Sequence, residues 1–296
     1  MTPIWLGLLG LALALPVPAL LARSTWPLRA PRAGIVMWQS LAVAAILATS
    51  GAGLSTALWL VSVDDPSPWR VVLHVAVLGV GVLVWARFWW AAWTVWRRTG
   101  ERRRRQRHLV DLLGEPDGAE PALRVLRHET PIAYCLPDRT KARVVVSSGT
   151  IDLLDEDGLR AVLEHERSHV RSRHDLVLEG FEFLRAAYPR FLRTDAPLHQ
   201  SQVMVELLAD DAARQVGGVK PVAKALVTLA DAPTPAGALG VGSAAAVRLE
   251  RLRDPDPSNR LVAASLYLFS AAVVVVPTVA IAIPWMVHAW QVLLER

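Results

Sequence analysis

Two histidines and a glutamate at a metal-binding spacing are the residues of this chain that most directly suggest chemistry. The motif His165-Glu166-x-x-His169 places its two histidines four residues apart. On a helix, at about 100° per residue, both imidazoles lie on one face and can bind one zinc ion. A zinc ion with three protein ligands keeps a position for water, and Glu166 beside it can take the water's proton during attack on a carbonyl. The pattern therefore predicts zinc-dependent peptide-bond hydrolysis.

A third zinc ligand is expected from a downstream helix. Glu206 is the best candidate, in the run Val203-Met-Val-Glu206-Leu-Leu-Ala-Asp210. If this run is helical, Asp210 lies one turn after Glu206 on the same face, where its carboxylate can accept the free ring N–H of a ligating histidine. The alternative interpretation is that both carboxylates belong to the solvated side of an ordinary helix.

Three other side chains are candidates for a role at this site. His174 lies nine residues beyond His165, about 180° round the same predicted helix, and is expected to point away from the metal. His199 shares the face of Glu206 if their helix begins near Pro197, so it either stabilises an oxyanion or is an ordinary surface residue. Cys135 is the single cysteine, which excludes a disulfide framework and favours a structural thiol over a nucleophile.

These motifs resemble those of the BlaR/MecR-type integral membrane zinc metallopeptidases, the antirepressor proteases that include the beta-lactam sensor receptors. The resemblance rests on His165-Glu166-x-x-His169, on the following Arg171-Ser-Arg-His-Asp175 and on Glu206-x-x-Ala-Asp210. More distantly, the motifs are similar to those of the CAAX-processing and heat-shock-type membrane proteases. The resemblance implies a zincin-like, gluzincin-type domain with these roles: His165, His169 and Glu206 as zinc ligands, Glu166 as general base, and Asp210 supporting a ligand.

The same resemblance implies a protein or peptide substrate, with a cytoplasmic transcriptional repressor as the candidate partner. The chain departs from the beta-lactam receptors, which carry an external penicillin-binding sensor after their last span. It contains no Ser-x-x-Lys sequence, which such a sensor needs. Direct sensing of beta-lactams is therefore not expected.

The composition indicates a membrane protein. Hydrophobic residues make up 53% of the 296 residues, tryptophan occurs 12 times, and the mean hydropathy is +0.32. The formal charge of +5 is carried mainly by arginines next to apolar stretches, which indicates membrane topology rather than direct nucleic-acid binding. Membrane lipid is therefore an expected partner, and nucleic acid is not.

Four uncharged or nearly uncharged stretches are long enough to cross a bilayer. The first three are expected at about 3–22, 35–63 and 69–96, within a membrane region 1–98, and the fourth lies in 258–296. Pro277 and Pro284 leave open whether the last stretch crosses once or twice. The arginine-rich segment 97–107 follows the third span and predicts a cytoplasmic anchor by the positive-inside rule. The N-terminus and the C-terminus are then expected outside a plasma membrane.

Residues 99–257 are expected to form the cytoplasmic protease domain. Residues 109–127 are predicted as a helix broken at 114–118, and 132–136 and 143–147 as two strands of a hairpin. A strand edge beside the motif helix would align an extended substrate. The acidic residues of 155–158 are expected to begin the motif helix. The segment 181–199 is a candidate for contact with the membrane surface.

The sequence therefore predicts a mainly α membrane protein, with four transmembrane helices and an α+β zinc protease domain inserted between the third and the fourth. Its predicted function is that of an endopeptidase acting at the cytoplasmic face, with repressor cleavage as its candidate regulatory role. One alternative is a housekeeping metalloprotease that degrades misfolded membrane proteins. Another is a non-catalytic signalling or scaffold protein with a structural zinc ion.

Overall fold

The computed structural model describes residues 2–62, 67–118, 120–138, 142–188, 194–230, 241–254 and 259–294. The chain divides into two compact units and is mostly helical. Unit 1 contains Met1–Val95, Gly180–Ser201 and Arg260–Arg296, and unit 2 contains Trp96–Glu179 and Gln202–Asn259. The segment Gly180–Ser201 therefore groups with the apolar helices, and its expected contact with the membrane surface stays a prediction.

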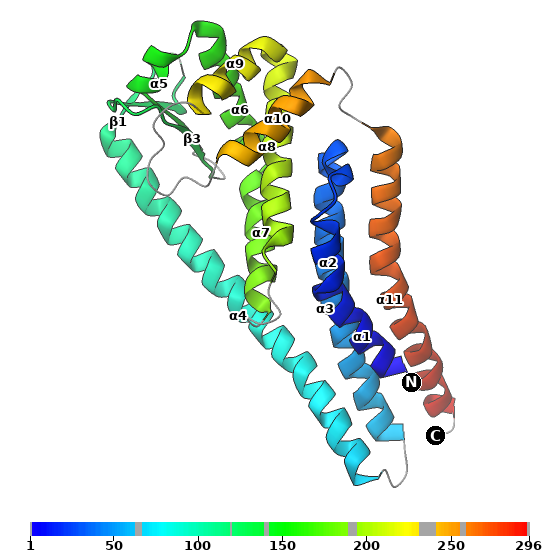
Figure 1. Cartoon of the computed structure of the whole chain (residues 1–296). Helices are drawn as coiled ribbons and strands as arrows, with labels where there is room; N and C mark the ends of the chain where they lie inside the picture. Colours follow the sequence, from blue (N-terminus) through cyan, green and yellow to red (C-terminus); the bar gives the residue numbers. More distant parts are fainter. Residues whose placement is uncertain are drawn as a thin grey trace. The chain divides into compact units, whose positions relative to one another are not determined.

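Unit 1 is built from long apolar helices (Figure 1). The elements that lie wholly in it are α1 (Thr2–Ala14), α2 (Pro16–Leu21), the short 3-10 helix η1 (Trp26–Arg29), α3 (Pro31–Ser62) and α11 (Arg260–Leu294). Three further helices have residues in both units: α4 (Pro68–Leu113), α7 (His174–Ala187) and α8 (Ala196–Gly217).

Among the described residues, three helical segments are long and apolar enough to cross a membrane: Pro31–Thr56, Pro68–Leu113 and Arg260–Ala280. The expected first span at 3–22 differs, because the helix is interrupted between α1 and α2 and its apolar part, Trp5–Leu21, is shorter. Pro16 begins α2 and has no N–H to continue the hydrogen bonds of α1. The four-span topology stays a prediction. The last apolar stretch forms one helix that contains both Pro277 and Pro284.

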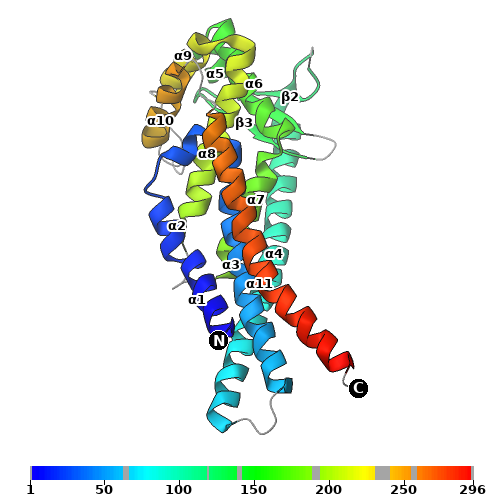
Figure 2. The same cartoon turned by 90° about the vertical axis from the view of Figure 1, so that its right-hand side faces the viewer.

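Small residues let the helices of unit 1 pack closely. Helix α3 contacts both α1 and α11 (Figure 2). Its buried face includes Ala33, Ala44, Ala48 and Ala52, and small side chains at such positions allow backbones to approach. A Cβ at Gly10 of α1 would come within 2.7 Å of the Thr49 hydroxyl oxygen, so a glycine is needed at this crossing.

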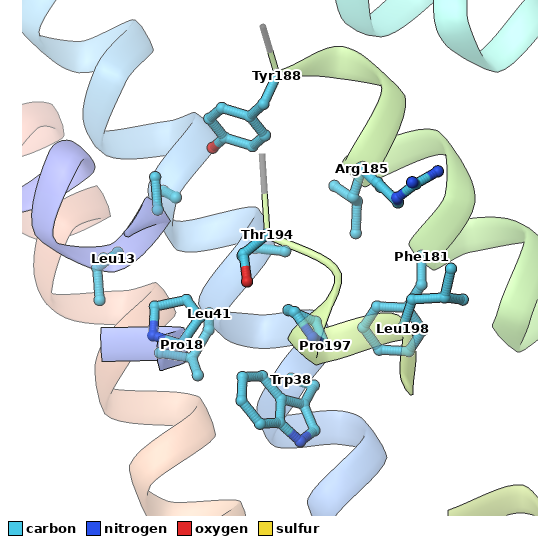
Figure 3. A pocket seen from close by; sticks show the side chains of 14 residues that line it. Leu13, Pro18, Trp38, Leu41, Phe181, Arg185, Tyr188, Thr194, Pro197 and Leu198 are labelled. Atoms are coloured by element: carbon cyan, nitrogen blue, oxygen red, sulfur yellow. The ribbon is translucent and has the colours of Figure 1, made fainter. Parts of the chain in front are cut away.

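An apolar pocket lies within unit 1. Leu13 and Leu41 line it from α1 and α3, and Phe181 and Leu198 line it from α7 and α8 (Figure 3). The ring of Trp38 is almost fully buried at the same place. The pocket therefore joins residues of Gly180–Ser201 to the N-terminal helices of the same unit.

Unit 2 contains a four-stranded sheet in the order β1-β2-β4-β3. The strands are β1 (Gly114–Pro116), β2 (Leu123–Leu126), β3 (Ala133–Leu136) and β4 (Arg143–Ser147). The predicted hairpin is confirmed, because β3 pairs with β4 in antiparallel register. The helix predicted for 109–127 is correct only as far as Leu113. Residues 123–126 instead form β2, which pairs in parallel with β4, and local sequence does not encode such a long-range pairing.

The valines of β4 explain why the sheet holds its position beside the motif helix. Side chains alternate between the two faces of a strand. Val144 and Val146 pack with Leu159 and Leu163, whereas Val145 packs with residues of the opposite face. The motif helix thus rests on one face of the sheet.

Helices α5 (Ser148–Leu153), α6 (Glu156–Arg171), α9 (Val219–Ala230) and α10 (Val241–Arg253) complete unit 2. Helix α6 carries the metal-binding motif and contacts β3 and α9 (Figure 1). Asp155 caps it by accepting a 2.9 Å hydrogen bond from the Gly158 N–H, and Glu156 and Asp157 occupy its first turn. The predicted acidic start of this helix is confirmed, and it stabilises the positive end of the helix dipole.

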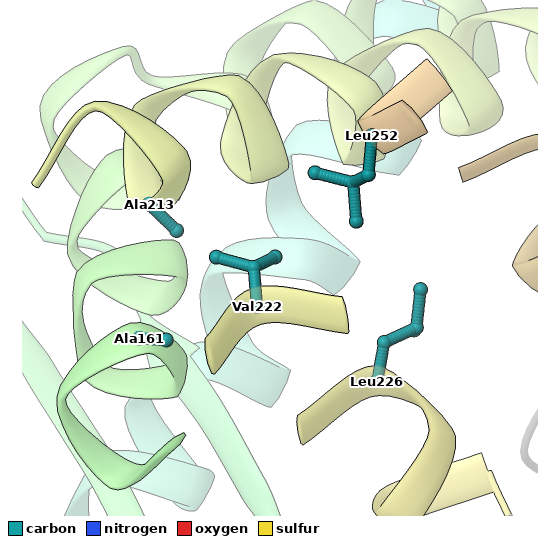
Figure 4. Packing of buried hydrophobic residues seen from close by; sticks show 5 residues of the cluster. All are labelled: Ala161, Ala213, Val222, Leu226 and Leu252. Atoms are coloured by element: carbon teal, nitrogen blue, oxygen red, sulfur yellow. The ribbon is translucent and has the colours of Figure 1, made fainter. Parts of the chain in front are cut away.

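A second core holds the helices of unit 2 together. Its buried side chains come from four helices and meet in the close-up of Figure 4: Ala161, Ala213, Val222, Leu226 and Leu252. Helices α6, α8, α9 and α10 are therefore packed around one apolar centre, which determines where their polar side chains converge.

Candidate active site

His165 and His169 lie on one face of α6, as their spacing indicated. Their Nε2 atoms are 3.1 Å apart, and their ring centroids are 4.9 Å apart. Contact between two ring nitrogens that face the same point contributes little stability by itself. Both nitrogens can, however, donate a lone pair to one cation. The pair is therefore arranged as a metal site requires.

Glu206 reaches the same point from α8. One carboxylate oxygen lies 3.3 Å from His165 Nε2 and the other 3.5 Å from His169 Nε2. The ligand atoms of His165, His169 and Glu206 all lie within 4.8 Å of one another. Two imidazoles and one carboxylate are the donor set of an open zinc site, so these residues fit a zinc ion.

The other ring nitrogen of each histidine also has a partner. His165 Nδ1 lies 2.9 Å from the Asp210 carboxylate, and His169 Nδ1 lies 3.0 Å from His174 Nδ1. Partners of this kind hold a ligating ring in one orientation and leave Nε2 free for the metal. The Asp210 carboxylate therefore lies beside a ring nitrogen of His165, and its predicted supporting role stays a prediction.

The prediction for His174 was wrong. It assumed that the motif helix continues through residue 174, but α6 ends at Arg171 and α7 begins at His174. Arg173 between them has a φ of 51°, in the left-handed region that helices do not use. This turn brings the buried His174 ring back against His169. A positive φ at an arginine has no reliable sequence signal.

Arg248 of α10 is the residue that sequence reasoning missed. Its guanidinium donates two hydrogen bonds to Asp210, at 2.6 and 2.7 Å, and lies 3.2 Å from a Glu206 oxygen. In the sequence it is one of several arginines in Val247-Arg-Leu-Glu-Arg-Leu-Arg253. Nothing in that run separates Arg248 from its neighbours, because its role depends on the packing of α10 onto α8.

The charges of the cluster suit a cation. Burial alone would lower the pKa of His165, but hydrogen bonds with Asp210 and Glu206 outweigh burial and raise it. Burial lowers the pKa of His169 to about 4 and keeps that ring neutral. Burial alone would raise the pKa of Glu206, but the hydrogen bond with His165 and nearby positive charge lower it to about 2. His165 therefore carries a proton, and with it a positive charge, at the point where a metal cation would bind. Binding of the metal ion would release this proton.

Glu166 has the environment of a general base. It lines the same cavity as His165 and Glu206, and burial raises the pKa of its carboxyl group. A base is most effective when its pKa approaches the working pH. The Cys135 thiol of β3 hydrogen-bonds to this carboxyl, and burial raises the thiol pKa to about 12. Cys135 is therefore a protonated donor, in agreement with a structural thiol rather than a nucleophile.

A cavity of about 380 Å³ opens over the cluster. Pro131, Ile132 and Ala133, at the start of the edge strand β3, are among the residues that line it. Residues of α9 line it as well. His199 is exposed on α8 and is not among the residues that line the cavity in the described part of the chain. The site therefore offers room for a peptide beside β3, the edge strand of the sheet in the described part of the chain.

Part of the sequence matches a known protein family. Residues 97–205 match the family model of Peptidase family M48. The matched segment includes α6 with His165, Glu166 and His169, and it ends one residue before Glu206. The family consists of metallopeptidases that are generally zinc-dependent. The place of Glu206 in the site therefore rests on geometry rather than on this match.

Two relatives are similar to part of the chain, and both are named "Protease HtpX homolog". The protein of Halobacterium salinarum is 28% identical over 117 residues, which cover 37% of this chain and 40% of the relative. The protein of Methanopyrus kandleri is 36% identical over 84 residues, 26% of each chain. The chain thus spans less than half the length of these relatives. No solved structure matches it significantly.

These similarities support the broader part of the expectation, a membrane metallopeptidase related to M48. The M48 match corresponds to the heat-shock-type proteases that the sequence resembled more distantly. The BlaR/MecR-type assignment is not supported by these matches and stays a prediction.

Proposed function

We propose that this chain is a multi-pass membrane zinc endopeptidase that hydrolyses peptide bonds of protein substrates. The observation that carries the proposal is the convergence of His165, His169 and Glu206 within 4.8 Å, with Glu166 in the same cavity. A structural zinc site needs no general base beside it, so Glu166 argues against the scaffold alternative.

In the proposed mechanism each residue of the site has a separate role. A zinc ion held by His165, His169 and Glu206 would polarise the scissile carbonyl and acidify a water molecule. Glu166 takes the proton of the attacking water and later delivers it to the leaving amine. Asp210 and His174 hold the two imidazoles in orientation. Arg248 balances the negative charge of Asp210 and Glu206.

Removal of the metal tests this function directly. The purified full-length chain in mild detergent is expected to contain one zinc ion per chain and to cleave casein. A chelator should remove both the zinc and the cleavage, and added zinc should restore them, because the ion supplies the Lewis acid. Elemental analysis and release of casein peptides measure the two quantities. A zinc-loaded protein that leaves casein intact would refute the proposal.

We further propose that residues 99–257 form a protease domain on the cytoplasmic side, with both termini outside. The arginine-rich segment 97–107 at the end of an apolar helix supports this orientation. Alkaline phosphatase fused after Arg107 is expected to be inactive in a bacterial host, since it would stay in the reducing cytoplasm. A fusion in the expected outer loop at residues 64–68 serves as the active control. An active fusion after Arg107 would invert the orientation.

The similarity to HtpX homologues and the resemblance to BlaR/MecR-type motifs each suggest a different class of protein substrate. Similarity to the HtpX homologues favours a housekeeping protease of membrane proteins. Cleavage of a cytoplasmic transcriptional repressor is the second candidate, and it rests on the BlaR/MecR-type motifs alone. A winged-helix repressor encoded beside this gene would favour the second.

A further inference from the structure

The cavity over the site has one wall that the proposed mechanism does not use. It is formed by α9, and its side chains are all apolar: Val222, Ala225, Leu226, Leu229 and Ala230. Val222 and Leu226 also belong to the core of unit 2, so packing against the other helices fixes the position of this wall in the fold. Ala225 is buried and Leu229 is partly exposed on the cavity side. We call these five residues the α9 wall.

Ala161 and Val162 of α6 extend the apolar lining. The charged or titratable lining residues belong to the cluster itself or to Arg248. The Arg248 guanidinium is already engaged by Asp210 and Glu206. Among the described residues of the α9 wall none is charged, so a charged substrate side chain packed against this wall would lose part of its hydration, which is costly.

The edge strand β3, which also borders the cavity, determines how a peptide would lie. Ile132 turns its backbone toward β4, because its carbonyl accepts the Ser147 N–H at 2.9 Å and its N–H donates to the Ser147 hydroxyl at 2.9 Å. Backbone groups of successive residues alternate in direction along an antiparallel strand. Those of Ala133 therefore point to the open edge, beside the cavity that it lines.

We propose that the α9 wall selects an aliphatic side chain next to the scissile bond, in a peptide paired with the backbone of Ala133. This inference rests on the proposed peptidase function and names its substrate class: unstructured segments rich in Leu, Ile, Val or Met. Such segments are buried in folded proteins and are exposed when proteins unfold or leave the membrane. The α9 wall therefore favours the housekeeping role over cleavage of one folded repressor.

The first test is the cleavage profile of the full-length, zinc-loaded chain on casein, read by mass spectrometry. Aliphatic residues are expected on one side of the cleaved bonds, preferred about 10- to 100-fold over Asp or Lys in kcat/KM. Fluorescent peptides that carry Leu or Asp at that position should differ similarly in their affinity for the Glu166→Gln protein. Anisotropy gives this second measurement without any turnover.

Variants of Leu229 test whether the α9 wall selects the substrate side chain. Leu229→Arg should shift the preference toward acidic side chains and Leu229→Glu toward basic ones, because each places a charge in the α9 wall. Leu229→Ala, which is milder toward folding, should shift the preference toward larger side chains such as Phe. Val227→Glu is the matched control, since Val227 is 46% exposed on the same helix and does not line the cavity. Its profile should equal that of the parent.

The outcomes separate the two proposals. Casein cleavage with no side-chain preference, or an unchanged profile in all three Leu229 variants, overturns the selection and leaves the peptidase function standing. Absence of cleavage by the zinc-loaded parent overturns the peptidase function and the selection with it.

Discussion

Replacement of Glu166 by Gln is expected to abolish proteolysis while zinc stays bound. Gln keeps the size of the side chain but cannot accept the proton of the attacking water. General-base catalysis contributes about 10²- to 10⁴-fold to such reactions, so kcat on casein or a peptide should fall about 1000-fold. The zinc ligands His165, His169 and Glu206 are untouched, and the metal content should stay that of the parent.

Two measurements on the same preparation check this expectation: zinc per chain by elemental analysis, and the initial rate of peptide release. Glu156→Gln is the matched control, because Glu156 lies on the same helix with its side chain 88% exposed. It should retain full activity. If Glu166→Gln cleaves as fast as the parent, Glu166 is not the base.

Replacement of Arg248 by Met is expected to destabilise the metal-free protein by about 3 kcal/mol, as removal of one partner from a buried ion pair does. The Asp210 side chain is only 2% exposed and that of Arg248 15%, so the carboxylate would stay buried with less compensation. Bound zinc also brings positive charge to Glu206, so the loss should be smaller in the zinc-loaded protein. Thermal unfolding followed by circular dichroism, with and without zinc, measures both effects.

Arg253→Met provides the comparison for Arg248→Met. Arg253 lies on α10 and is exposed, so its loss should leave the unfolding temperature within the error of the measurement. An Arg248→Met protein that unfolds at the parent temperature in the absence of zinc would show that the ion pair with Asp210 contributes nothing to stability.

Local patterns predicted the parts of the site that one element supplies. His165 and His169 share a face because they are separated by about one helical turn, and the same reasoning placed Asp210 one turn after Glu206. The β3–β4 hairpin and the acidic start of α6 could also be predicted, since the alternation of side chains along a strand and the capping of a helix depend on neighbouring residues. The strand β2 was missed because its pairing with β4 joins segments that lie far apart in the sequence.

The sequence by itself determined that this chain carries a two-histidine metal motif with an adjacent carboxylate, and that much of it is apolar enough for a membrane. Only the tertiary structure decided which distant side chains complete the site. It brought Glu206 to the motif, turned His174 back onto His169, placed Arg248 on both carboxylates and brought the α9 wall and the start of β3 to one cavity. Each of these placements depends either on the packing of α6, α8, α9 and α10 around their common core or on the left-handed backbone of one residue, Arg173. Neither the packing nor the left-handed residue has a periodic signal in the sequence.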